Sequence, residues 1–174
     1  MHLYFIAIML PPKLDKEIRS LQEEMAANYG SSRQLKIPVH ITLLPPFKNN
    51  SNENVIAAFE KVCSLINKPT EISLNGFGEF RNKVLFVKVV KSKALSAMRT
   101  EILSNITESL SLELPAHYQH FHPHITIANR DLTRKAFLAA WPVFKDRPFQ
   151  PHFNKVEIAL FKHIEGYWKK IKGA

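Results

Sequence analysis

The chain has very little cysteine, since Cys63 is the only one in 174 residues. A lone thiol excludes an intrachain disulfide and a zinc site built from several cysteines. No apolar run reaches the length of a membrane-spanning helix. The apolar residues 3–10 lack a basic segment before them, and Pro11-Pro12-Lys13 follows where a signal peptide needs small residues. We therefore expect a soluble, cytoplasmic protein without a membrane partner, in which residues 3–10 form a core strand.

Acidic residues are also scarce in this sequence. The chain has 15 Asp and Glu against 24 Lys and Arg, which gives a net charge of +9. Such a balance favours an anionic partner such as RNA or a nucleotide. The length allows one domain, or two small lobes that share a core, and nothing in the sequence requires more than a monomer.

Two copies of a His-x-Thr triplet stand out, His40-Ile41-Thr42 and His124-Ile125-Thr126. With this composition, roughly 0.3 such triplets are expected by chance. Two copies are therefore stronger evidence for a functional motif than one copy would be. Both lie in apolar, β-branched runs that predict buried strands. Residues i and i+2 of a strand share a face, so each copy presents an imidazole and a hydroxyl together. The plainer interpretation is two half-buried histidines in ordinary strands.

The remaining pattern predicts the same order of elements twice: strand, helix, motif strand, helix, strand. Pro45-Pro46 is expected to end the first motif strand, and turns are expected at Arg81-Asn82-Lys83 and Glu165-Gly166. Hydrophobic periodicity predicts helices at about 13–28, 52–66, 92–112 and 133–141, and the last three can be capped by Ser51 or Asn52, by Ser92 and by Thr133. The first motif strand is expected at 37–44, and further strands are expected at 71–80, 84–90, 154–163 and 167–171.

This duplication predicts an α+β protein of one domain, residues 1–174, with lobes from pseudo-repeats at about 3–80 and 84–172. A duplicated chain folds most simply as two similar lobes about a pseudo-twofold axis. Both histidines then lie in one central cleft. Two imidazoles in one cleft suit paired general acid–base catalysis near neutral pH, such as cleavage of a phosphate ester, with Thr42 and Thr126 donating to its oxygens. This chemistry requires no metal.

Three segments of the chain resemble the 2H phosphoesterase superfamily, and most closely its bacterial 2′-5′ RNA ligase-like proteins. They are Pro38–Phe47, His122–Ala128, and Gly76–Phe80 followed by Lys83–Val87. The resemblance implies a bilobal fold, with two antiparallel sheets and outer helices around an open cleft. It also implies a phosphodiesterase that acts without a metal or cofactor on 2′,3′-cyclic phosphate ends of RNA or on small cyclic nucleotides. The resemblance further implies a possible 2′-5′ RNA ligase activity.

The resemblance further implies His40 as the proton donor, His124 as the proton acceptor, and Thr42 and Thr126 as phosphate ligands. The residues themselves do not order the two histidines. Many relatives place arginine directly after the small residue of the second motif, where this chain has Asn129, and Arg130 follows. In a continuing strand, that shift points the guanidinium of Arg130 to the opposite face.

Further candidates for substrate contacts are Phe47, Tyr118 and Arg130. Aromatic side chains stack on bases, although they more often belong to a core. His117, His120 and His122 precede His124, and a metal site there is an alternative, because imidazole binds zinc, copper and nickel. Another alternative is a non-catalytic module that binds a nucleotide or RNA in the same cleft.

Overall fold

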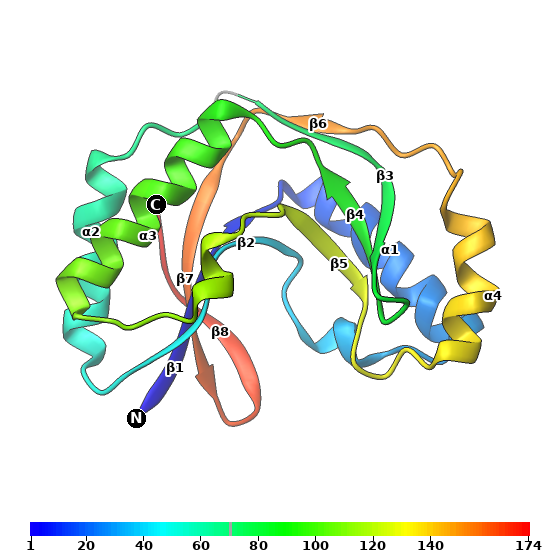
Figure 1. Cartoon of the computed structure of the whole chain (residues 1–174), viewed down its shortest axis with the longest axis horizontal. Coiled ribbons are helices and arrows are strands. Elements are labelled where there is room, and N and C mark those ends of the chain that lie inside the picture. Colours follow the sequence, from blue (N-terminus) through cyan, green and yellow to red (C-terminus); the bar gives the residue numbers. More distant parts are fainter. Residues whose placement is uncertain (70) are drawn as a thin grey trace.

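The computed structural model describes residues 1–69 and 71–174. Its elements follow the predicted order, with two short 3₁₀ helices and a two-residue strand at His152–Phe153 added (Figure 1). They are β1 (His2–Met9), α1 (Pro12–Tyr29), η1 (Arg33–Lys36), β2 (His40–Asn49), α2 (Asn52–Leu65), β3 (Ile72–Phe80), β4 (Val84–Val89), α3 (Lys93–Leu110), η2 (Ala116–Gln119), β5 (His124–Ala128), α4 (Arg134–Phe144), β6 (His152–Phe153), β7 (Glu157–Ile164) and β8 (Tyr167–Gly173).

The strands form two four-stranded antiparallel sheets, in the orders β2-β1-β7-β8 and β5-β4-β3-β6. Each sheet draws on both halves of the sequence, because β7 pairs with β1 while β3 pairs with β4. The lobes therefore do not coincide with residues 3–80 and 84–172. The two motif strands, β2 and β5, are edge strands of their sheets and contact each other at the centre of the molecule (Figure 1).

The helices cover the outer sides of the sheets (Figure 1). Helices α2 and α3 pack together, and α3 contacts β2, whereas α1 packs against α4 and β5. One apolar cluster runs through both lobes and includes Ile6, Ile18, Val87 and Ile127. The α+β class with two antiparallel sheets and outer helices is confirmed. No helix among the described residues is long and apolar enough to cross a membrane.

The first motif strand continues through Pro45-Pro46, and the expectation that these prolines end it is wrong. In the register with β1, Leu44 pairs with Ile6 and Phe47 pairs with Tyr4, so the two prolines lie in an irregularity between matched pairs. A proline lacks the N–H that a central strand must donate, but it is tolerated at a bulge of an edge strand. Strand β2 meets both conditions.

The predicted turns and caps are confirmed. Arg81 and Asn82 have φ of 51° and 57°, as the central residues of a type I′ hairpin turn require, and Glu165-Gly166 forms the same kind of turn. The Ser51, Ser92 and Thr133 side chains accept hydrogen bonds from the backbone N–H three residues later.

Loss of the Ser92 cap is expected to destabilise α3, the helix that lies against β2. The Ser92 hydroxyl accepts a hydrogen bond of 3.0 Å from the Leu95 N–H. Ser92→Ala removes this acceptor and is expected to lower the free energy of unfolding by about 1 kcal/mol in urea denaturation. Ser104→Ala is the control, because Ser104 is exposed in the interior of the same helix. An equal loss in both variants would contradict the capping role.

Candidate active site

The His-x-Thr triplets begin the two central strands, since His40 is the first residue of β2 and His124 the first of β5. Along both strands the side chains alternate as predicted. Ile41 and Ile125 are buried in the core, whereas each histidine and its threonine are half-buried on the opposite face. Because the strands contact each other, this face presents both triplets to the space between the lobes.

Each imidazole is oriented by its own backbone. His40 Nδ1 lies 2.6 Å from the carbonyl oxygen of Pro38, and His124 Nδ1 lies 2.7 Å from that of His122. A carbonyl oxygen only accepts, so Nδ1 carries the hydrogen in both rings. In the neutral rings, Nε2 is therefore the free base, which leaves one equivalent nitrogen on each histidine for proton transfer.

Phenylalanine rings from neighbouring strands hold both imidazoles. The Phe5 ring of β1 lies 4.9 Å from the His40 ring, and the Phe86 ring of β4 lies 5.1 Å from the His124 ring, measured between centroids. The Phe86 ring in turn packs directly against the backbone of β3 at Gly78, where an added Cβ would lie 2.5 Å from the ring. Gly78, part of the mid-chain segment, thus permits this close approach.

Burial lowers the pKa of both histidines. The pKa of His40 falls from its ordinary value of 6.5 to about 4, because burial disfavours the imidazolium, and the nearby His124 adds a smaller effect in the same direction. Burial also lowers the pKa of His124, with His122 as a further contributor. The hydrogen bonds to the backbone carbonyls oppose these shifts without cancelling them.

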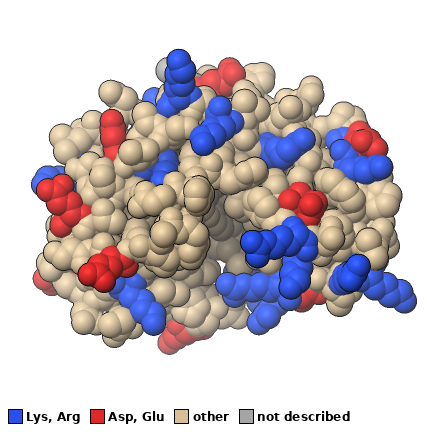
Figure 2. All heavy atoms as spheres, in the orientation of Figure 1, with Lys and Arg blue, Asp and Glu red and all other residues tan. Residues whose placement is uncertain are grey.

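Two adjoining cavities contain the motif residues. The first, here called the His40 cavity, has a volume of about 230 Å³, and His40, Thr126 and Trp168 are among its lining residues. The second, the His124 cavity, has about 310 Å³ and includes His124 and Phe121 in its lining. Thr42 and Pro46 line both, so the two cavities adjoin at these residues. Figure 2 shows a hollow at the centre of this face.

Arg99 is a site residue that the sequence did not reveal. Its side chain extends from α3 into the lining of the His124 cavity, although the residue is only 4% exposed. It donates to the Tyr118 carbonyl and lies over the Phe121 ring at 5.5 Å, while its Nε has no hydrogen-bond partner among the described residues. Arg99 also takes part in none of the ion pairs found in residues 1–69 and 71–174.

A buried guanidinium without a carboxylate is costly, because its desolvation is not repaid by an opposite charge. An anion bound in the His124 cavity would supply that charge. In the sequence, this region shows only a helical spacing, and an arginine in such a helix is usually a solvated surface residue.

The structure brings only some of the predicted substrate contacts together. Arg130 lines the His40 cavity. It does so because β5 ends at Ala128, and the backbone at Arg130 has a φ of 65°, so the strand alternation no longer applies to it. Phe47 is 4% exposed and stacks on Tyr4 instead. Phe47 and Tyr118 line a separate cavity.

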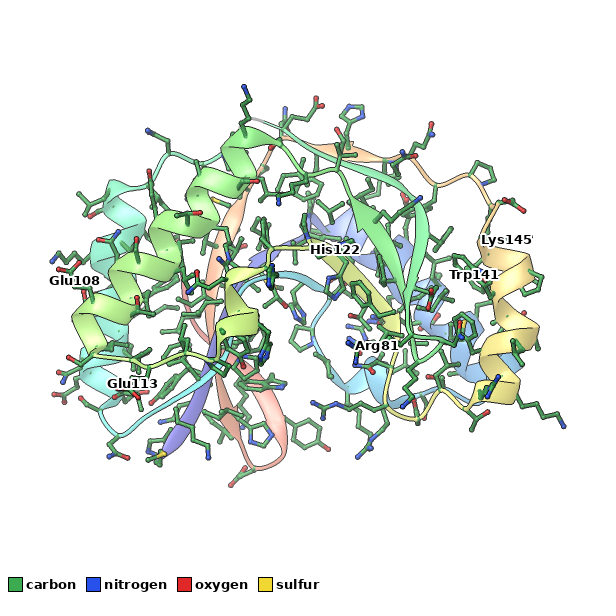
Figure 3. All side chains as sticks on the ribbon, in the orientation of Figure 1. Arg81, Glu108, Glu113, His122, Trp141 and Lys145 are labelled. Atoms are coloured by element: carbon green, nitrogen blue, oxygen red, sulfur yellow. The ribbon has the colours of Figure 1, made fainter. Side chains whose placement is uncertain are left out.

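The alternative of a metal site at the histidines before β5 has no geometric support. His120 and His122 precede the strand, although both line the His124 cavity together with His124. Throughout the described parts of the chain, no three His, Cys, Asp or Glu side chains are grouped so that they can hold a metal ion. Figure 3 shows His122 above the central opening.

Comparison with known proteins decides the family. A family model described as the 2′-5′ RNA ligase superfamily matches residues 10–166. The chain belongs to this superfamily. The resemblance to 2H phosphoesterases is thereby confirmed. No curated protein sequence matches the chain.

Several solved structures share the fold along nearly the whole chain. Apo LigT of E. coli is 18% identical, with 99% of this chain and 96% of that chain covered and a TM-score of 0.69. The protein TT0787 of Thermus thermophilus is 20% identical, with 99% and 96% covered and a TM-score of 0.66. E. coli LigT complexed with NADP+ is 19% identical, with 99% and 95% covered and a TM-score of 0.63. At these identities, the similarity establishes the fold alone.

The lowered pKa of His40 predicts a loss of stability in mild acid. The unfolded chain takes up a proton at this histidine below pH 6.5, whereas the folded chain does so only near pH 4. The free energy of unfolding therefore falls as the pH falls between these values. From pH 7 to pH 4.5, His40→Gln is expected to lose about 2 kcal/mol less than the wild type in urea denaturation.

The matched control for this prediction is His152→Gln, which alters an exposed histidine of β6. It is expected to follow the wild type at both pH values. Parallel losses in wild type and His40→Gln would show that the imidazole is not buried in its neutral form.

Proposed function

We propose that the protein is a metal-independent phosphodiesterase that opens 2′,3′-cyclic phosphates at RNA ends or in related cyclic nucleotides. The observation that carries the proposal is the pair of imidazoles, each with Nδ1 on a backbone carbonyl and Nε2 left for proton transfer, around one cleft. The family supports it. So do the nucleotides and phosphate bound by E. coli LigT, which has been solved with 3′-AMP and with phosphate.

The proposed reaction needs one proton acceptor and one proton donor. Nε2 of one histidine takes a proton from water as the water oxygen bonds to phosphorus. The bond from phosphorus to one ribose oxygen breaks, and the other histidine gives that oxygen a proton, which leaves a phosphate monoester and a free hydroxyl. A ribose hydroxyl or 5′-hydroxyl in place of water forms a phosphodiester, so ligation uses the same two groups. Following the family, His40 is the donor to the leaving oxygen and His124 the acceptor.

The charge of the phosphate also needs partners. Thr42 and Thr126 place hydroxyl donors beside the two histidines, and Thr42 lies where the His40 and His124 cavities join. Arg99 on one side and Arg130 on the other bring positive charge to the two cavities. Such donors are effective in catalysis because they are already oriented before charge develops.

Hydrolysis by histidine variants tests the proposal directly. Wild type, His40→Ala and His124→Ala are incubated with RNA and mononucleotides that carry 2′,3′-cyclic phosphates, in excess EDTA. Wild type is expected to form product, and each variant is expected to lose at least about 100-fold in kcat/KM, since it lacks one proton-transfer group. The position of the phosphate in the product identifies the leaving oxygen.

His152→Ala is the control, and unchanged urea denaturation curves show that the variants are folded. Full activity in both single variants at the motif would contradict the proposal. RNA binding by wild type with no product from any cyclic phosphate would instead favour the non-catalytic binding module.

Arg99 is expected to serve the substrate rather than the fold. Arg99→Met keeps the length of the side chain but removes its charge, so kcat/KM for a cyclic phosphate is expected to fall about 100-fold. The free energy of unfolding is expected to drop by no more than about 1 kcal/mol, because a neutral side chain avoids the desolvation cost of an unpaired buried guanidinium.

Arg99→Lys separates charge from geometry in this experiment. A lysine keeps the positive charge but lacks the planar, five-donor group, and an intermediate kcat/KM is expected. A large loss of stability with unchanged activity in Arg99→Met would assign Arg99 to the fold alone.

A further inference from the structure

Another cavity, of about 510 Å³, lies beside the His40 cavity and is rich in positive charge. We call it the basic pocket, and its lining residues are Arg81, Asn82, Lys83, Asn129, Arg130, Leu132 and Arg134. Four of these side chains are cationic, and none is acidic. Figure 2 shows Lys and Arg side chains gathered to the right of the central hollow, and Figure 3 shows Arg81 reaching from the β3–β4 turn toward the opening.

The nearby carboxylates of Glu79 and Asp131 take part in none of the ion pairs found among the described residues. The Glu79 side chain accepts a hydrogen bond from the Asn82 N–H. The Asp131 carboxylate accepts hydrogen bonds from the Ser31 hydroxyl and from the N–H groups of Ser32 and Arg33. Although burial alone would raise it, these hydrogen bonds lower the pKa of Asp131, so its charge is fixed on the loop that precedes η1.

Arg81, Lys83, Arg130 and Arg134 take part in none of the ion pairs found in the described part of the chain. Like charges held around one cavity repel each other, and an anionic ligand relieves that repulsion.

The backbone around the pocket is also unusual. Five non-glycine residues of the described ranges have positive φ, and three of them, Arg81, Asn82 and Arg130, line this one pocket. Type I′ turns favour Asn-Gly, so an arginine as the first central residue costs conformational free energy. Such strain persists where the surrounding structure enforces it, and it is concentrated at binding and active sites.

The pocket adjoins the candidate active site. Asn129 and Arg130 line both the basic pocket and the His40 cavity. A ligand that places one phosphate between the histidines and carries further phosphates therefore extends directly into the basic pocket. A nucleic acid strand has this chemistry, whereas a single cyclic nucleotide has only one phosphate.

We propose that the basic pocket binds the backbone phosphates of an RNA strand next to its terminal cyclic phosphate, an inference that rests on the proposed function. The substrate is then an RNA end rather than a free cyclic mononucleotide. The contacts are to phosphates, so they position the strand without reading its sequence. Binding through the pocket is also sensitive to salt, because each neutralised phosphate releases a counterion.

The test compares two substrates with the same reactive group, a 2′,3′-cyclic mononucleotide and a short RNA that ends in a 2′,3′-cyclic phosphate. The double variant Arg81→Ala, Arg134→Ala removes two cations of the pocket and leaves Arg130, which also lines the His40 cavity. The ratio of kcat/KM for RNA to kcat/KM for the mononucleotide is expected to fall at least tenfold. The slope of log affinity for RNA against log salt is expected to decrease by about 1.4, at about 0.7 per phosphate contact.

The control is the double variant Lys61→Ala, Lys155→Ala, which removes the same charge from exposed residues outside the three cavities. An equal fall for both substrates in the pocket variant, or the same fall in the control, would overturn the inference.

A binding measurement distinguishes failure of this inference from failure of the proposed function. If wild type turns over neither substrate, fluorescence anisotropy with a labelled RNA that ends in a 3′-phosphate still tests the pocket. Weaker binding in the pocket variant than in the control would then support the pocket while the phosphodiesterase proposal fails. Equal binding by the two double variants would overturn the inference about the basic pocket as well as the proposed function.

Discussion

Each half of the chain completes the sheet of the other half, and the position of the histidines depends on this exchange. Strand β7 closes the sheet that begins with β1 and β2, and β3 closes the sheet that begins with β4 and β5. The inner edge of each sheet is therefore a motif strand. Because the helices cover the outer sides, the two motif strands face the centre of the molecule, where they contact each other.

Elements outside the motif fix the protonation and the direction of the two rings. A backbone carbonyl accepts a hydrogen bond from Nδ1–H of each ring, and a phenylalanine from the adjacent strand lies against each ring. These contacts also bury the imidazoles, which is why the pKa of each is lowered. Positioning and pKa are thus set by the same packing, so a change at Phe5 or Phe86 would alter both.

Local signals in the sequence were sufficient for most of the fold and for the two triplets, because alternation along a strand, serine caps and hairpin turns are decided by neighbouring residues. The failures concern longer-range geometry. Pro45-Pro46 is compatible with β2 only because that strand lies at a sheet edge, which the pairing of distant strands determines. Arg99 occupies an ordinary helical position, and only the packing of α3 against β2 brings it to the cavity. Arg130 reaches the His40 cavity because β5 ends two residues earlier.

Under the proposed function, charge and proton uptake are coupled in this cleft. Both imidazoles are neutral near pH 7 without a ligand, because burial lowers the pKa of each, so the attraction for a phosphate comes from Arg99 and Arg130 rather than from the histidines. A bound anion stabilises an imidazolium and raises its pKa. The phosphate thereby promotes protonation of the histidine that must act as the acid, while the other ring remains a base. The acid form of the site is thus produced by the substrate, which explains how two histidines in similar surroundings take opposite roles.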